Sequence, residues 1–305
     1  MLRALYYRLA PASLRIPVWH LRTGLTQLVR GDPQWRGHLA DLYLWRGITV
    51  GEVSVDGTVL AVDLHDHGVG RPLYIRREYE VPESAFLRGS LRPGMVFVDA
   101  GAHVGYFSTL AARRVGSGGK VVAFEPDPHN FALLTRNLSR NRLDNVLPQQ
   151  LALGSSAETR RLFFSTDNLG DHRLHDDESD PRRSLAVTVD TLDHALERSG
   201  VTRVDAIKLD VQGSELDAVK GGERTLRSNG GIVVLAELWP YGLERAGGSA
   251  KELFDFFHVR GFRAHVVKPN GPSAAAMPWP DVEACIPPVD ERHPDLAYVN
   301  VVFRR

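Results

Sequence analysis

From residue 95 onward the chain alternates short apolar runs, typical of buried strands, with segments whose apolar residues recur at helical spacing. The helical segments cover residues 104–115, 128–141 and 251–261. The apolar runs cover residues 95–101, 120–126, 145–154, 203–211, 231–238, 262–267 and 296–305. Strands that alternate with helices form a mainly parallel sheet with helices on both faces. We therefore predict an α/β domain built on a mostly parallel, seven-stranded sheet.

The residues upstream of this pattern divide into two further parts. Residues 1–46 carry seven arginines against two aspartates, with three of the five tryptophans, and residues 2–9 have helical apolar spacing. They predict a helical N-terminal extension, which either covers an apolar face or supplies acceptor contacts or a dimer surface. Residues 48–64 alternate apolar and polar around Asp56-Gly57, a tight hairpin turn. The expected parts are thus the extension 1–46, a small β element 47–78 and a main domain 79–305.

Composition excludes several classes of protein. Lysine and arginine total 37 and aspartate and glutamate total 37, so the net charge is zero and gives no general attraction to nucleic acid. Nothing approaches the roughly 18 uninterrupted apolar residues of a membrane-spanning helix. Cys285 is the single cysteine, which excludes an intrachain disulfide. We expect a cytoplasmic protein. His65 and His67 could share a strand face and bind a metal ion, but an ordinary loop is favoured.

The turn after the first strand of the main domain reads D-x-G-x-x-x-G, with Asp99, Gly101 and Gly105. This is not the G-x-G-x-x-G of dinucleotide-binding proteins. An acid two residues before the first glycine would repel a pyrophosphate and attract a cation. The second strand ends in Glu125, where a carboxylate can accept both hydroxyls of a ribose. A ligand with a cation, a ribose and no phosphate is S-adenosylmethionine. As alternatives, the glycines only permit tight packing and Glu125 is a solvated strand end.

Several segments in this order resemble the FkbM-type family of class I S-adenosylmethionine-dependent methyltransferases. The resemblance runs from about residue 79 to 267, with the terminal NVVFRR also fitting. It rests on five segments: YEVPESAFLRGSLRPGMVFVDAGAHVGYFSTLAA, VVAFEPDPHNFALLTRNL, NLGDHRL, VTVDTLDHAL and IKLDVQGSELDAVKGGERTL. It implies a Rossmann-like class I methyltransferase fold and S-adenosylmethionine as the cofactor.

The resemblance also implies roles for individual residues. Ten residues would surround the cofactor, from its methionine end and methyl group to its ribose and adenine. They are Asp99, Gly101, His103, Gly105, Glu125, Pro126, Asp127, Asn130, Ala152 and Asp210. Two positions depart from the family pattern. His103 stands where asparagine is usual, and Gln212 replaces a glutamate, although Glu215 remains. A glutamine keeps hydrogen bonding but cannot act as a base.

The segment 167–180 (DNLGDHRLHDDESD) is the best source of polar active-site groups outside these motifs. Asn168, Asp171 and His172 lie in the family's N-x-G neighbourhood. His172 is a candidate general base, with Asp171 or Asp210 orienting it or binding a divalent ion such as Mg²⁺. The acidic residues 176–180 are expected to form a mobile, solvated loop. Glu237, which ends the fifth strand, is a further candidate carboxylate.

These observations predict an S-adenosylmethionine-dependent methyltransferase that acts on a hydroxyl oxygen of a small natural product or sugar. Methylation of nitrogen or carbon and a non-catalytic S-adenosylmethionine-binding or partner-binding domain stay open as alternatives. The expected partner is a small-molecule acceptor, without nucleic acid or a membrane span, and a homodimer is left open.

Overall fold

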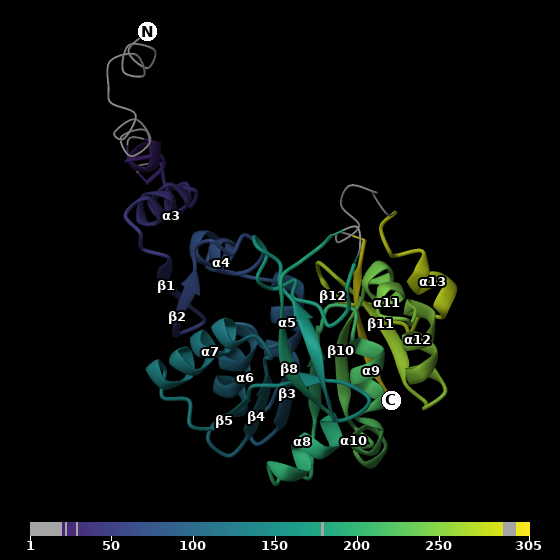
Figure 1. The fold of residues 1–305 in the computed structure, drawn as a ribbon. Coiled ribbons are helices and arrows are strands. Elements are labelled where there is room, and N and C mark those ends of the chain that lie inside the picture. Colours follow the sequence, from purple (N-terminus) through teal and green to yellow (C-terminus); the bar gives the residue numbers. More distant parts are fainter. Residues whose placement is uncertain (1–19, 22, 29, 178–179, 289–296) are drawn as a thin grey trace. The chain divides into compact units, whose positions relative to one another are not determined.

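The computed structural model describes residues 20–21, 23–28, 30–177, 180–288 and 297–305 (Figure 1). The helical prediction for residues 2–9 lies outside the described residues. The described chain packs as two compact units. The smaller unit comes from the residues up to Tyr79 together with Thr166–Gly170, and the larger unit consists of Glu80–Ser165 and Asp171–Arg305. No helix in these ranges is long and apolar enough to cross a membrane.

The smaller unit joins helices to the predicted hairpin. Its elements are α3 (Trp35–Trp45), β1 (Val50–Val55), β2 (Thr58–Asp63) and α4 (Gly70–Arg76), and residues 20–21 and 23–28 are also helical. The strands pair antiparallel around the Asp56-Gly57 turn, which confirms the hairpin. Asp66 ties the segment 166–170 to this unit, since its carboxylate accepts from the backbone of Gly70 at 2.6 Å and of Leu169 at 3.0 Å.

The larger unit contains the predicted α/β sheet. Its strands are β3 (Val96–Ala100), β4 (Lys120–Phe124), β5 (Val146–Gln149), β9 (Ala206–Leu209), β10 (Val233–Leu238), β11 (Arg263–Lys268), β12 (Gly271–Pro272) and β13 (Val299–Arg304). They lie in the order β12-β11-β13-β10-β9-β3-β4-β5. The pairs from β5 to β10 are parallel, and β13 is antiparallel to both β10 and β11. The mostly parallel sheet is thus confirmed, with the two-residue β12 added at its edge.

Helices pack on both faces of this sheet. They are α5 (Val81–Ser90), α6 (Tyr106–Val115), α7 (Pro128–Arg140), α8 (Leu192–Arg198), α9 (Glu215–Lys220), α10 (Glu223–Ser228), α11 (Pro240–Arg245), α12 (Ala250–His258) and α13 (Trp279–Glu283). One buried cluster joins the sheet to α8, α9, α10 and α12, through side chains such as Val98, Leu216 and Phe257. The other face carries α6 and α7, which bury Leu110 and Leu134. The two layers hold the strands between them, so the loops at the strand ends carry the polar chemistry.

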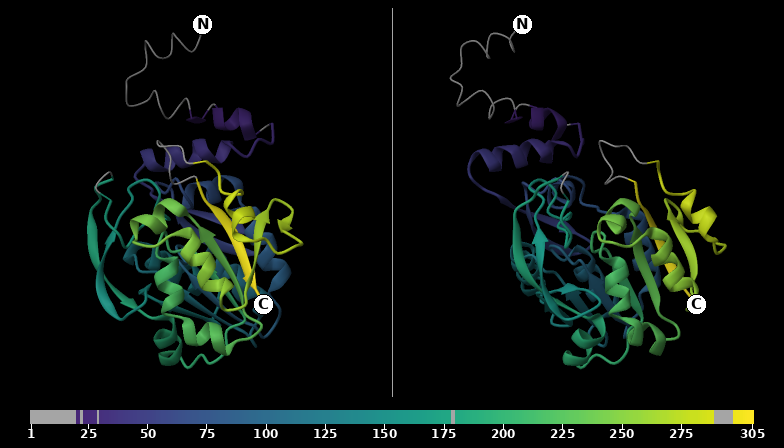
Figure 2. Two further views of the ribbon diagram at one scale, coloured as in Figure 1. Left: turned by 90° about the vertical axis from the view of Figure 1, so that its right-hand side faces the viewer. Right: turned by 45° about the vertical axis from the view of Figure 1, so that its right-hand side comes forward.

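A separate three-stranded sheet interrupts the series. It is formed by β6 (Ala152–Leu153), β7 (Glu158–Phe163) and β8 (Ser184–Asp190), in the order β6-β8-β7. The antiparallel β7–β8 pair is the long teal ribbon in Figure 2. The loop between these two strands carries the candidate residues Asp171 and His172.

Candidate active site

The strand order places a topological switch point between β3 and β9. The chain runs outward in one direction through β4 and β5, and in the other through β9 and β10. In open α/β sheets, ligands bind beyond the carboxyl ends of the strands at such a point. Asp99 and Gly101 lie at the end of β3, and Asp210 follows β9. The fold therefore gathers the predicted residues at the place where this class of fold binds ligands.

Asp99 is a fully buried carboxylate within β3. Its Oδ2 accepts a hydrogen bond from Ser108 Oγ in α6 at 2.6 Å. Its Oδ1 is buried without a hydrogen-bond partner among the residues that the structure describes. Burial raises the pKa of Asp99 to about 6, although Lys208 and the Ser108 hydrogen bond oppose the shift. One buried oxygen at the end of β3 thus has spare capacity to accept a hydrogen bond or to face a cation.

Two glycines allow the β3–α6 turn to pack against its neighbours. Gly101 has φ +82°, and a Cβ there would lie 1.8 Å from the backbone oxygen of Asp210. Gly105 has φ +88°, and its Cβ would lie 2.5 Å from Leu134 Cδ1 of α7. Side chains are strained at these angles and are also excluded by the contacts. Gly101 therefore lets the ends of β3 and β9 approach each other, and Gly105 lets α7 pack against the turn.

Glu125 is a buried carboxylate whose two oxygens are fixed by the backbone. Oε2 accepts from the backbone N–H of His103 at 2.8 Å, and Oε1 accepts from that of Asp127 at 2.9 Å. Burial raises the pKa of Glu125 to about 8, against the effect of these two hydrogen bonds. The side chain is 5% exposed, so it is not the solvated strand end considered above. The carboxylate links the turn after β3 to the turn after β4.

The turn after β4 begins α7. Asp127 caps this helix, since its Oδ2 accepts from the backbone N–H of Asn130 at 2.8 Å. Asp127 and Asn130 are buried, as Glu125 is, and Pro126 between Glu125 and Asp127 is half-buried. Ala152 lies in β6, where it is buried and paired with Val189. The predicted ribose-binding residues thus form one continuous turn, while Ala152 belongs to the smaller of the two sheets in this unit.

A buried lysine, missed by the sequence reasoning, holds the carboxylate at the end of β9. Lys208 Nζ lies 2.7 Å from Asp210 Oδ2, and its side chain is 5% exposed. Burial lowers the pKa of Lys208, but the charges of Asp210, Glu80 and Asp99 outweigh it, and the net shift is upward. The sequence feature that could have identified it is a single lysine inside the apolar run of β9. Lys208 fixes Asp210 and stays charged.

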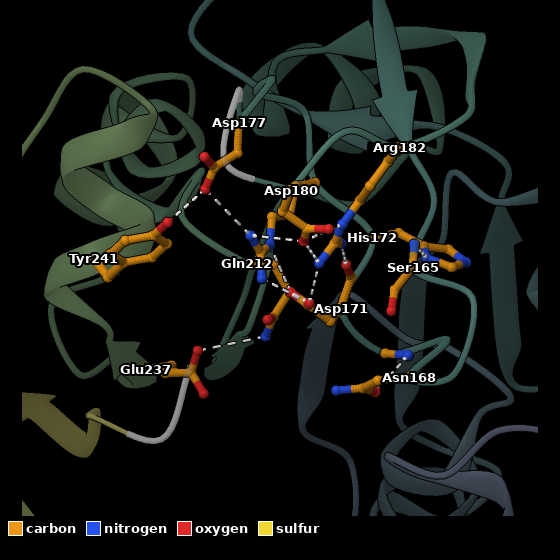
Figure 3. A network of polar contacts seen from close by, with 12 residues as sticks. Ser165, Asn168, Asp171, His172, Asp177, Asp180, Arg182, Gln212, Glu237 and Tyr241 are labelled. Atoms are coloured by element: carbon orange, nitrogen blue, oxygen red, sulfur yellow. Dashed lines mark hydrogen bonds and ion pairs between the residues drawn. The ribbon is translucent and has the colours of Figure 1, made fainter. Parts of the chain in front are cut away.

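Gln212 joins two carboxylates at this edge of the sheet. Its Nε2 donates to Asp210 Oδ1 at 2.7 Å. It also donates to Glu237 Oε1 at 3.4 Å (Figure 3). Burial, with the charges of Asp210 and Glu215, raises the pKa of Glu237 well above its ordinary value. A glutamate at position 212 would add a third carboxylate here, whereas the amide supplies the donor that both neighbours need. The departure from the family pattern therefore has a structural consequence.

The loop between β7 and β8 is held by ion pairs. Asp171 accepts from Arg173 Nε and Nη2 at 2.7 Å each, and from Arg182 Nη2 at 2.7 Å (Figure 3). Asp171 is buried, and its oxygens are engaged by arginines rather than by His172 in the hydrogen bonds of the described chain. The expected Asp171–His172 contact is thus replaced by a buried ion-pair cluster, because two guanidinium groups compete for this carboxylate.

The acidic residues after this cluster are not all solvated. Asp177 is 4% exposed and accepts a hydrogen bond from Tyr241 Oη at 2.6 Å (Figure 3). Asp176 and Asp180 are exposed, as expected for a solvated loop. Residues 178–179 lie outside the described ranges. The prediction of a solvated loop is wrong for Asp177, which pairs with Arg173 of the same loop and with Arg245 of α11 and accepts the Tyr241 hydrogen bond from α11.

His172 lies beside the turn that follows β4. Its Nδ1 accepts from the backbone N–H of Ser165 at 3.2 Å, and its Nε2 lies 3.9 Å from Asp127 Oδ2. Burial lowers the pKa of His172 to about 4, although the charge of Asp127 opposes this. Its neighbours place it near the predicted ribose-binding residues rather than near Asp210. Its role as general base stays a hypothesis. Because one ring nitrogen accepts from Ser165 and the other faces Asp127, we instead expect another group to take the acceptor's proton.

We expect His172→Ala to keep turnover within about tenfold of the wild type, because one ring nitrogen is already engaged and the other faces Asp127. A histidine with a pKa near 4 is neutral above about pH 5. We therefore expect no inflection between pH 6 and 7 that depends on His172. The measurement is the pH profile of kcat for both proteins. A fall of about 10²–10⁴ at unchanged S-adenosylhomocysteine affinity would instead make His172 the base.

A divalent ion at Asp171 or Asp210, left open from the sequence, is not supported. Asp210 pairs with Lys208, and Asp171 pairs with two arginines. Within the ranges described above, the group with metal-ligand spacing is His20, His38 and Asp41 of the smaller unit. His65 and His67, considered from the sequence, are exposed and do not belong to this group.

Comparison with known proteins settles the family. The family profile described as "Methyltransferase FkbM domain" matches residues 99–264, more than half of the chain. The protein belongs to the FkbM methyltransferase family. The matched segment begins at Asp99 and contains the β3–α6 turn, Glu125, the β7–β8 loop and Asp210.

Three curated relatives resemble this FkbM-family chain over part of their length. Methyltransferase sdnD of Sordaria araneosa is 33% identical over 153 residues, which are 41% of this chain and 59% of sdnD. The 31-O-demethyl-FK506 methyltransferase FkbM of Streptomyces tacrolimicus is 28% identical, over 44% of this chain and 61% of that protein. Hexuronic acid methyltransferase AglP of Haloferax volcanii is 27% identical, over 46% and 54%. The match thus spans less than two thirds of each of the three.

Two solved structures with a similar course of the chain are named as methyltransferases. A putative O-methyltransferase from Klebsiella pneumoniae has a TM-score of 0.44 and 12% identity, over 74% of this chain and 80% of that one. A putative methyltransferase from Streptococcus mutans, solved with S-adenosylhomocysteine (SAH), has a TM-score of 0.41 and 11% identity, over 73% and 94%.

Proposed function

We propose that this protein is an S-adenosylmethionine-dependent methyltransferase that acts on a hydroxyl oxygen of a small natural product or sugar. The observation that carries the proposal is the fixed carboxylate of Glu125 at the end of β4. His103 and Asp127 hold its two oxygens through their backbone N–H groups. Each oxygen retains a further lone pair, so the pair of oxygens can accept two hydroxyls of a ribose.

The residues around this carboxylate fit S-adenosylmethionine better than a dinucleotide. Asp99 places a buried, incompletely paired carboxylate oxygen at the end of β3, which suits a cation and would repel a pyrophosphate. Asp99 and the Gly101–Gly105 turn would hold the methionine end, while Glu125, Asp127 and Asn130 would hold the ribose side. When bound, the cofactor supplies a methyl group that its sulfonium already activates.

The chain's own task is then to orient the acceptor and to receive its proton. Asp210 follows β9, next to the Gly101 turn, and its carboxylate is held by Lys208 and Gln212. We propose that it accepts a hydrogen bond from the acceptor hydroxyl and takes the proton as the new oxygen–methyl bond forms. Orientation of the hydroxyl at a near-attack distance of about 3–3.5 Å is a further part of its role.

The acceptor class rests on the relatives' names. One relative is named for an O-demethyl substrate and another for a hexuronic acid. Both names support an oxygen acceptor on a natural product or sugar. A cytoplasmic location, a homodimer, an acceptor-selecting role for residues 1–46 and the absence of nucleic acid among the partners stay predictions.

Transfer of a labelled methyl group tests this function. The protein is incubated with ¹³C-methyl-labelled S-adenosylmethionine and a panel of hydroxylated natural products and sugars, and products are read by NMR. We expect label on oxygen, with one S-adenosylhomocysteine formed per methyl transferred. Label on nitrogen or carbon would overturn the oxygen assignment. Tight SAH binding without transfer to any acceptor would favour the non-catalytic alternative.

A further inference from the structure

The smaller unit contains two histidines and one aspartate at metal-ligand spacing. His38 and Asp41 lie three residues apart on α3, so they share one face of the helix. His20 comes from the helical residues that precede α3. Its Nδ1 lies 3.0 Å from His38 Nδ1 and 3.1 Å from Asp41 Oδ2. Three donor atoms thus converge from two helical segments.

A cation from a third helix orients the aspartate. Arg71 of α4 hydrogen-bonds Asp41 Oδ1 and also donates to the backbone oxygen of Gly37 at 3.3 Å. This contact leaves Oδ2 as the oxygen that faces His20. Groups that orient a ligand in this way are typical of metal sites, where they are nearly as important as the ligands themselves.

The site is enclosed but open enough for a small ion to enter. The side chains of His20 and Asp41 are 13% and 30% exposed, and His38 is half-buried. Gly24 lets the preceding helical segment approach α3, because a Cβ there would lie 3.3 Å from His38 Cβ. The two segments therefore hold the rings at close range.

We propose that His20, His38 and Asp41 bind one Zn²⁺ ion, with water completing a tetrahedral set. Zinc bonds to imidazole nitrogen and carboxylate oxygen are about 2.0–2.2 Å, which sets neighbouring ligand atoms about 3.3 Å apart. The separations of 3.0 and 3.1 Å reach this value with shifts of a few tenths of an ångström. Two imidazoles in the donor set favour zinc over Mg²⁺ or Ca²⁺, which prefer oxygen alone.

The competing explanation is a hydrogen-bonded network of His20, His38, Asp41 and Arg71 that needs no ion. Only the zinc site predicts stoichiometric metal binding, and this binding can be measured without an assay of methyl transfer.

The test uses the full-length protein, stripped with EDTA, dialysed and titrated with ZnCl₂ by calorimetry. We expect one Zn²⁺ per chain, and a tetrahedral visible spectrum when Co²⁺ is used as the probe. His38→Gln and Asp41→Asn should each weaken zinc binding at least about a hundredfold, beyond the 10–100-fold typical of losing a supporting group. The matched control is His65→Gln/His67→Gln, which removes two exposed histidines of the same unit and should bind zinc normally.

Three results would overturn the proposal. They are the absence of stoichiometric binding by the wild type, binding that survives both His38→Gln and Asp41→Asn, and binding lost in the His65/His67 control. Circular dichroism of each variant establishes that it is folded. Should His38→Gln unfold, His20→Gln provides a second ligand variant, and the cobalt spectrum of the wild type tests the tetrahedral site without any substitution.

Discussion

Asp210→Asn is expected to bind S-adenosylhomocysteine as the wild type does and to transfer methyl groups about 10²–10⁴ times more slowly. The asparagine has nearly the same size as the aspartate. Its amide oxygen can still accept the hydrogen bond that Gln212 Nε2 donates to Asp210 Oδ1 at 2.7 Å in the wild type. It loses the negative charge that faces Lys208 and cannot take a proton from the acceptor. Calorimetry with SAH and single-turnover kinetics separate the two effects.

A matched control is an aspartate at the other end of the same strand. Asp205 directly precedes β9, at the opposite end from Asp210, and accepts from the backbone N–H of Val96 at 2.7 Å. Asp205→Asn should therefore leave kcat unchanged while altering a hydrogen bond of similar kind. Because removing one partner of a buried ion pair costs about 3–5 kcal/mol, thermal unfolding must show that Asp210→Asn is folded at the assay temperature. Full turnover by Asp210→Asn would refute its role.

The strands of the main sheet could be predicted because they are buried on both faces. A parallel strand covered by helices is a continuous apolar run, as in residues 95–101 and 120–126, and each run ends at a glycine or proline. By contrast, β7 (Glu158–Phe163) was missed, because its outward side chains are charged and only Leu162 is buried. Its pairing with β8 depends on residues more than twenty positions away, which local pattern does not reveal.

The predicted strand 145–154 shows a second limit of local patterns. The structure divides it into β5 (Val146–Gln149) and β6 (Ala152–Leu153), which belong to different sheets. β5 pairs with β4, whereas β6 pairs with β8, so the chain changes sheets between Gln149 and Ala152. Apolar residues continue through this change, because both sheets bury them. The sequence pattern therefore carries no sign of the break.

The candidate site could be predicted where a backbone motif determines it. Gly101 and Gly105 were identified because only glycine tolerates their turn, and Glu125 because it ends a strand. Partners brought in by tertiary packing could not be identified. The fold places the charged Lys208 beside Asp210, and it also places two arginines beside Asp171.

Glu125→Ala is expected to weaken SAH binding roughly ten- to a hundredfold. The titration is run at pH 9, above the raised pKa of Glu125, so that the carboxylate proposed to accept the ribose hydroxyls is ionised. Losing a hydrogen bond to a charged group costs about 1.5–3 kcal/mol. The substitution also frees the backbone N–H groups of His103 and Asp127, which the side chain now holds at 2.8 and 2.9 Å. Glu223→Ala, which removes an exposed glutamate of α10, is the control and should bind SAH normally.

The proposed cofactor site is tested by a calorimetric titration of the wild type, Glu125→Ala and Glu223→Ala with S-adenosylhomocysteine and with NAD. We expect SAH binding by the wild type and Glu223→Ala, a roughly ten- to hundredfold weakening in Glu125→Ala, and no measurable binding of NAD by any of them. Equal SAH affinity in all three proteins would remove Glu125 from the ribose site. Binding of NAD in place of SAH would contradict the proposed cofactor itself.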